Sequence, residues 1–167
     1  ANFFDYDLDG DLDVYIVNNE IIKFDFPNRF RPAMKDGSHP NTDKLFRNDW
    51  NDSLKHPVFT NVSHQAGITI DGYGHAVAIT DINRDGWKDI YVTNDYLSND
   101  LLWINNKNGT FSEQLNTYFK HTSANAMGNE VTDINNDGLV DVVVLDMNPE
   151  DNYRKKMMLN PNSYQTY

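Results

Sequence analysis

Short runs of β-branched and aliphatic residues recur along the chain, separated by polar segments rich in Asp, Asn and Gly. The clearest runs are residues 14–17, 90–93 and 142–145. Such runs favour strands over helices. An alternating segment, residues 75–80, precedes the second run, and residues 129–132 occupy the matching place before the third. The pattern therefore predicts β-hairpins with a polar loop between their two strands.

Further apolar segments follow two of these hairpins. Residues 45–48 (Leu-Phe-Arg-Asn) match residues 102–105 (Leu-Trp-Ile-Asn), and residues 58–60 match residues 110–112. Asn108-Gly109 lies between the last two segments of the second set and predicts a tight turn, because both residue types tolerate positive φ. We expect an all-β fold in which each repeat has four short antiparallel strands.

The polar loops share one motif, D-x-[DN]-x-D-G-x-x-D, at residues 5–13, 81–89 and 133–141. The chain contains 21 Asp and only 4 Glu. This imbalance favours turns and metal loops over helical surfaces. A motif of this length that occurs three times in one chain predicts a repeated structural unit.

Oxygen ligands at alternating positions, followed by a Gly that permits a sharp turn, are typical of Ca²⁺ loops. An EF-hand is rejected, because its closing Glu would fall on Ile16, Val92 or Val144, and strands rather than helices flank the loops. Position seven is expected to offer its backbone carbonyl and position nine a carboxylate. The candidate ligands are Asp5, Asp7, Asp9, Asp11 and Asp13 in the first loop, Asp81, Asn83, Asp85, Trp87 and Asp89 in the second, and Asp133, Asn135, Asp137, Leu139 and Asp141 in the third.

The first loop places five acids in nine residues. Two carboxylates about 4 Å apart repel by roughly 4 kcal/mol at an effective dielectric constant of about 20, so a bound cation would relieve strain there. Asn at position three of the other loops lowers their charge and their expected affinity. Many oxygen ligands favour Ca²⁺ over Mg²⁺ and disfavour zinc and copper. We expect about three Ca²⁺ ions, and a set of solvated acidic turns is the alternative.

The three loops, with Gly74-His-Ala-Val upstream and Leu102-Trp-Ile-Asn downstream of the second, resemble FG-GAP/VCBS repeats. These are the calcium-binding blades of integrin-α-like β-propellers, and residues 146–153 resemble large bacterial VCBS-repeat proteins. The resemblance implies a secreted or cell-surface protein, associated with the outer membrane if bacterial. A ring of four to eight blades is typical, so about three blades predict a partial ring within a longer protein.

The spacing of the loops predicts the organisation of the chain. Residues 1–72 are expected to form an incomplete first blade with an insertion at about 20–43, residues 73–122 a second blade, and residues 123–147 the start of a third. Residues 148–167 are expected to form a short helix and a tail, because a Pro, then acids, then bases follow one another along residues 149–159.

Composition narrows the functional classes. Lys and Arg number 14 against 25 Asp and Glu, which gives a net charge of −11 and argues against a nucleic-acid partner. Hydrophobic residues make up 39% of the chain, enough for a packed core, and no apolar run is long enough to span a membrane. Zero Cys leaves the redox compartment open.

These observations favour a non-enzymatic role, in which calcium rigidifies the hairpins and the surface serves adhesion or the recognition of a protein or glycan. The remaining blades or another subunit are expected partners. The alternative is part of a calcium-dependent polysaccharide lyase or hydrolase, although no His recurs with the repeats. Trp50 is the candidate for stacking on a sugar, whereas Trp87 is expected to cover an ion and Trp103 to pack between blades.

Overall fold

The structure of the chain is a computed structural model that describes residues 1–20, 32–95, 98–123 and 125–147. Within these residues it contains two sheets of four strands and one sheet of two strands, with every pairing antiparallel. The predicted all-β fold with four-stranded antiparallel units is confirmed. No closed ring is formed by the part of the chain that is described.

The first sheet has the strand order β1-β2-β3-β4. Its strands are β1 (Asn2–Phe4), β2 (Asp13–Ile16), β3 (Lys44–Asn51) and β4 (His56–Asn61). The loop with the first Asp motif joins β1 to β2, as the sequence predicts. Part of the expected insertion at 20–43, residues 21–31, lies outside the described residues.

The second sheet repeats this order with β5 (Gly74–Thr80), β6 (Asp89–Asn94), β7 (Leu101–Asn105) and β8 (Phe111–Glu113). The tight turn between β7 and β8 is present, but its positive φ angles fall on Lys107 (63°) and Gly109 (79°) rather than on Asn108 and Gly109. Asn108 instead uses its side-chain oxygen to accept the Thr110 N–H at 3.1 Å. An Asx-type turn therefore replaces the simple two-residue turn.

The third sheet contains β9 (Ala126–Thr132) and β10 (Asp141–Asp146). A single-turn helix, α1 (Leu115–Tyr118), follows β8 and buries Leu115. The sequence did not predict α1, because four residues are too few to show a helical period. The helix expected within residues 149–159 lies outside the described residues. No helix in the described part is both long and apolar enough to cross a membrane.

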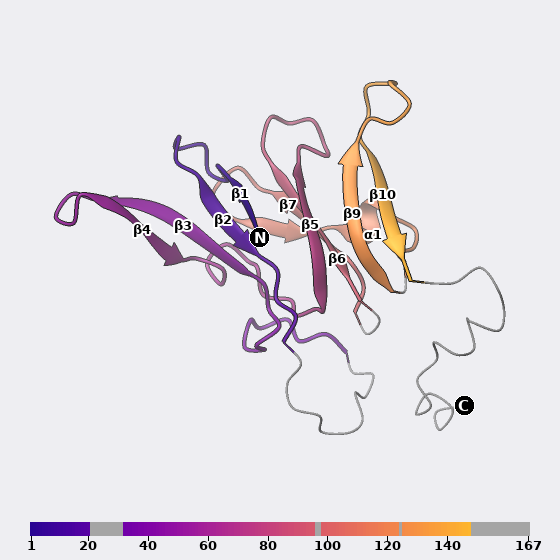
Figure 1. The fold of residues 1–167 in the computed structure, drawn as a ribbon, viewed down its shortest axis with the longest axis horizontal. Helices are drawn as coiled ribbons and strands as arrows, with labels where there is room; N and C mark the ends of the chain where they lie inside the picture. Colours follow the sequence, from indigo (N-terminus) through magenta and orange to yellow (C-terminus); the bar gives the residue numbers. More distant parts are fainter. Residues whose placement is uncertain (21–31, 96–97, 124, 148–167) are drawn as a thin grey trace.

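The three sheets lie side by side with the second in the middle, and the three Asp-motif loops project from the same edge (Figure 1). β1 lies against β5, and β9 lies against β5 and β6. Both faces of the second sheet are therefore covered, which explains why every residue of β6 and β7 is buried.

Side-chain alternation along β6 and β7 divides the core into two clusters. Ile90, Val92 and Trp103 point to the cluster shared with the first sheet, and Tyr91 and Leu102 to the cluster shared with the third. Trp103 is 2% exposed, so the predicted packing between repeats is confirmed. The core thus fixes the three hairpins relative to one another and aligns their loops along one edge.

Candidate metal centre

Position one anchors each loop by accepting two backbone N–H groups. Its Oδ1 accepts the N–H of position five, and its Oδ2 accepts the N–H of the Gly at position six. The two distances are 3.2 and 3.0 Å for Asp5, 2.9 and 2.8 Å for Asp81, and 3.1 and 2.7 Å for Asp133. The three motifs therefore fold into the same local structure.

Position nine closes the loop from inside the protein. Asp13 is 0% exposed; its Oδ2 accepts the N–H of Tyr6 at 3.1 Å and its Oδ1 accepts the N–H of Asn48 at 2.8 Å. Burial raises the pKa of Asp13, while these two N–H groups act in the opposite direction. The carboxylate thus ties the loop to the third strand of its own sheet.

The second loop repeats this closure. Asp89 is also 0% exposed, and it accepts the N–H of Ile82 at 2.9 Å and that of Asn105 at 2.9 Å. In the third loop, Asp141 accepts the N–H of Ile134 at 3.0 Å and is partly exposed. The bond to a third-strand Asn is thus shared by the first two loops.

The tight path of each loop needs positive φ at two positions. Gly at position six has φ values of 97°, 90° and 80° in the three loops, which agrees with the role predicted for it. Position four is also left-handed, with φ of 60° at Leu8, 60° at Arg84 and 58° at Asn136. This second strained position could not be predicted from the sequence, because three different side chains occupy it.

The first loop gathers three carboxylates. One oxygen from each of Asp5, Asp7 and Asp13 lies within 4.8 Å of the others, the only such group of three acids or histidines among the described residues. Asp7 Oδ1 is buried and has no hydrogen-bond partner. Burial, and then the charges of Asp9 and Asp5, raise the pKa of Asp7.

A divalent cation fits this donor set. It would supply the missing partner of Asp7 Oδ1 and offset the repulsion among the carboxylates, and hard oxygen ligands suit Ca²⁺. Asp9 and Asp11 lie outside the triad, and the Asp11 N–H donates to Asp9 Oδ1 at 2.9 Å. The triad could hold a metal; ligation by Asp9 and by the Asp11 carbonyl stays a prediction.

The second loop has the same backbone but different charges. Asn83 stands at position three, and Lys107 Nζ lies 3.3 Å from Asp85 Oδ2. Burial opposes ionisation of Asp85, yet hydrogen bonds from the Trp87 N–H and from Lys107 hold its pKa below the ordinary value. An ammonium group of the protein is therefore already paired with Asp85, one of the ligands predicted from the sequence.

The third loop is the most exposed of the three. The Leu139 N–H and the Asn135 side chain lower the pKa of Asp137, and the Arg84 charge acts in the same direction. Asn135 Oδ1 accepts the Asp137 N–H at 2.9 Å, as Asn83 Oδ1 accepts the Asp85 N–H at 3.0 Å. Metal ligation by the residues of the second and third loops also stays a prediction.

Comparison with known families identifies part of the chain. Residues 81–144 match the sequence profile of the FG-GAP-like repeat. This segment of the chain is an FG-GAP-like repeat. The FG-GAP-like repeat runs from the first residue of the second loop, through β6, β7 and β8, to β10. FG-GAP repeats often bind Ca²⁺, and the first loop, which lies before the matched segment, has the same hydrogen-bond frame. Among curated proteins, none matches the chain.

A second repeated feature, missed in the sequence, lies at the opposite end of the hairpins. Tyr15 Oη donates to Asp43 Oδ2 at 2.8 Å, and Tyr91 Oη donates to Asp100 Oδ2 at 2.7 Å. The other oxygen of each Asp accepts the N–H of an Asn three residues after the Tyr, at 2.9 Å in both cases. Burial raises the pKa of Asp43 to about 6 and also raises that of Asp100.

The residues that form these Tyr–Asp and Asn–Asp hydrogen bonds also recur in the sequence. The pattern Y-x-x-N starts at Tyr15 and at Tyr91, and D-x-L starts at Asp43 and at Asp100. Asn48 and Asn105, whose N–H groups support position nine, likewise end the matched segments 45–48 and 102–105. The recurrence of these Asn residues could be seen in the sequence. Their role could not, because the group that donates to position nine is the backbone N–H, which every residue type except Pro carries.

Proposed function

We propose that the chain is a calcium-binding segment of β-propeller type that serves as a rigid scaffold for recognition of a protein or glycan. The observation that carries this proposal is the triad of Asp5, Asp7 and Asp13, with an unpartnered buried oxygen on Asp7. The match of residues 81–144 to the FG-GAP-like repeat supports the same role for the second and third loops. Asn83 and Asn135 then provide neutral oxygen ligands at position three.

Calcium would stabilise the conformation of each loop. Each loop joins two strands whose other ends are already held by the core, so the ion mainly removes repulsion and fixes the loop path. With a Kd of about 0.1 mM and about 1 mM free Ca²⁺, each occupied loop would add about 1.4 kcal/mol to stability. Such calcium levels favour an extracellular or cell-surface location, which is part of the proposal.

The first and third sheets expose apolar side chains and an unpaired strand edge that another part of a protein could cover. Phe3 on β1 is 59% exposed and Leu145 on β10 is 67% exposed, and β10 pairs only with β9 among the described strands. Open edges and apolar faces of this kind are normally covered. We assign this role to the remaining blades of a propeller or to another subunit.

Thermal unfolding of the 167-residue chain in 2 mM CaCl₂ and in excess chelator tests the proposal. The expected result is an upward shift in Tm of roughly 3 °C for each occupied loop, with a smaller shift in MgCl₂. Asp7→Asn serves as the matched variant, because it keeps the shape of the side chain while removing one charge of the triad. Coincident melting curves in calcium and chelator would contradict the proposed function.

A further inference from the structure

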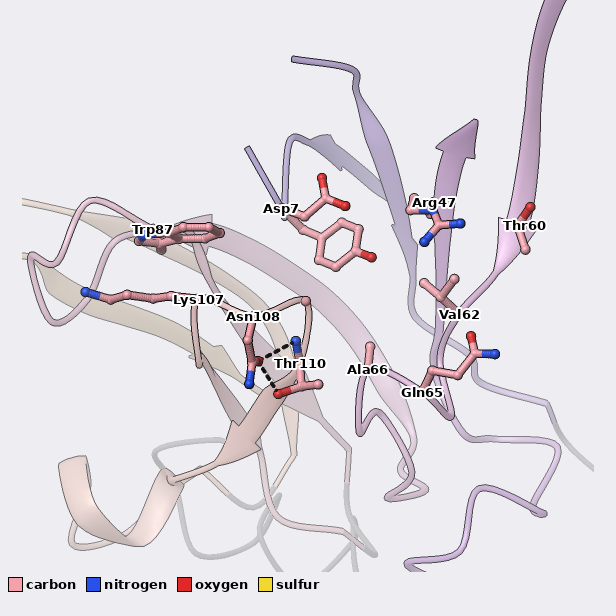
Figure 2. Close-up of a pocket in the computed structure, with 12 residues that line it drawn as sticks. Asp7, Arg47, Thr60, Val62, Gln65, Ala66, Trp87, Lys107, Asn108 and Thr110 are labelled. Carbon is pink, nitrogen blue, oxygen red and sulfur yellow. Dashed lines mark hydrogen bonds between the residues drawn. The ribbon is translucent and has the colours of Figure 1, made fainter. Parts of the chain in front are cut away.

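A cleft of about 580 Å³ opens between the first and second sheets, next to two of the Asp-motif loops. Asp7 from the first loop and Trp87 from the second both line it. Figure 2 shows Trp87 and Asn108 on one side and Arg47 and Gln65 on the other. The volume lies within the range of about 300–1,000 Å³ that is usual for small-molecule sites.

The cleft presents planar polar groups held in defined orientations. Asn108 Oδ1 accepts both the N–H and the hydroxyl of Thr110, at 3.1 and 2.6 Å, which fixes the amide. Its Nδ2 group donates to none of the described residues and remains a donor for a ligand. Gln65 is exposed and forms no side-chain hydrogen bond within the described chain, so its amide is equally available.

The two cationic groups of the cleft are each paired with a carboxylate, and the one acidic residue that lines it, Asp7, belongs to the first Asp-motif loop. Arg47 Nε and one Nη lie 2.8 and 3.3 Å from the oxygens of Asp49. Lys107 Nζ lies 3.3 Å from Asp85 Oδ2, and Figure 2 shows this ammonium directed away from the other lining residues. Little positive charge is left to attract an anion, so hydrogen-bond donors rather than net charge define the site.

Apolar surface completes the cleft. The indole of Trp87 is partly exposed on one wall; Figure 2 shows Val62 on the opposite wall between Arg47 and Gln65, with Ala66 nearer the middle. A pyranose ring has one face of C–H groups, which pack on an aromatic plane, and a rim of hydroxyls, which need fixed donors and acceptors. This combination matches the cleft.

We propose that the cleft binds a neutral pyranose sugar, with its C–H face against Trp87 and its hydroxyls hydrogen-bonded to Arg47, Gln65 and Asn108. The inference rests on the proposed recognition role and names its ligand class. It differs from the expectation drawn from the sequence, where Trp50 was the candidate for stacking. Trp50 is 58% exposed, but it does not line this cleft.

NMR of the ¹⁵N-labelled chain with CaCl₂ provides a site-specific test, because its three Trp residues give three indole N–H signals. The probes are the methyl glycosides of glucose, galactose, mannose and N-acetylglucosamine, with glucuronic acid as the charged comparison. At least one neutral glycoside is expected to shift the Trp87 signal in a saturable manner and to leave the signals of Trp50 and Trp103 in place.

Variants separate this site from the metal loops. Trp87→Ala and Asn108→Ala are each expected to weaken binding of the glycoside by about tenfold or more, measured on the backbone amide signals of residues 107–110, which both variants retain. Gln65→Ala is expected to weaken it less, and Trp50→Ala, the matched aromatic control, is expected to bind as the unaltered chain does. Circular dichroism checks that each variant is folded.

Three outcomes would overturn the inference: no shift of the Trp87 signal by any glycoside, equal binding by Trp87→Ala and Asn108→Ala, or tighter binding of glucuronic acid than of every neutral probe. Failure of the proposed calcium binding can be told apart from failure of sugar binding, because the melting curves in calcium and in chelator are measured without any sugar. A chain that shows the calcium-dependent Tm shift but binds no glycoside would retain the proposed scaffold and lose only this site.

Discussion

The first and second Asp-motif loops have one backbone frame and two electrostatic designs. In both, position one accepts two N–H groups and a fully buried position nine accepts two more. Only the first loop has Asp at position three, and only the second has an ammonium group, that of Lys107, against its position-five carboxylate. The hydrogen bonds to backbone N–H groups therefore set the fold of such a loop, and we propose that the charges placed on that frame set its affinity for a cation.

The shared frame gives the largest expected effect. Asp13→Ala and Asp89→Ala each leave two N–H groups without their acceptor, so each should lower the free energy of unfolding by about 2–4 kcal/mol. Urea denaturation in the presence of chelator measures this without any contribution from metal. Asp141→Ala is the control and should cost less, because that side chain is partly exposed. Clearly unequal costs for Asp13 and Asp89 would break the comparison.

Exchanging the residue types at position three of the first two loops should change their calcium affinities in opposite directions. Asp7→Asn is expected to weaken calcium binding at the first loop by about tenfold, and Asn83→Asp to strengthen it at the second loop by a similar factor, since charge count tunes affinity. In the absence of calcium, Asp7→Asn should stabilise the chain, because burial and neighbouring acids disfavour the ionised Asp7. Calcium titrations and chelator melts of the two variants check both statements.

Removing the ammonium group of Lys107 should increase calcium affinity by a smaller factor. Lys107→Met is expected to raise the calcium affinity of the second loop about threefold, because a partly exposed ion pair is worth only a fraction of a kcal/mol. Lys88→Met removes the same charge from the second loop itself, at a side chain that forms no ion pair with the described residues, and should change the affinity less. If both variants gave the same gain, overall charge and not the Asp85 contact would be responsible.

A change of pH from 7 to 5 should affect the two loops unequally. The pKa of Asp7 is raised, so protons compete for this carboxylate at a higher pH than usual; the pKa of Asp85 is lowered, so it stays ionised. Calcium affinity of the first loop is therefore expected to fall more than that of the second. Titrations at the two pH values with Asp7→Asn, which cannot protonate there, isolate the effect; an equal fall at both loops would contradict it.

Much of this arrangement could be predicted from the sequence. The loop positions, the hairpins around them and the third and fourth strands followed from the repeated motif and from the matched segments at Leu45 and Leu102. The left-handed position four and helix α1 could not, because they depend on backbone geometry. The Tyr–Asp hydrogen bonds were missed although the residues that form them recur in the sequence, because they join segments that are distant along the chain. The cleft that Trp87 lines was also missed, since two separate sheets form it.

Isothermal titration of the cation-free chain with CaCl₂ at pH 7 tests most directly whether these loops bind calcium. The account predicts saturable binding of about three ions per chain, in which the tightest step is the one lost or weakened in Asp7→Asn. An absence of saturable binding up to about 10 mM calcium, or a tightest step that Asp7→Asn leaves unchanged, would contradict it.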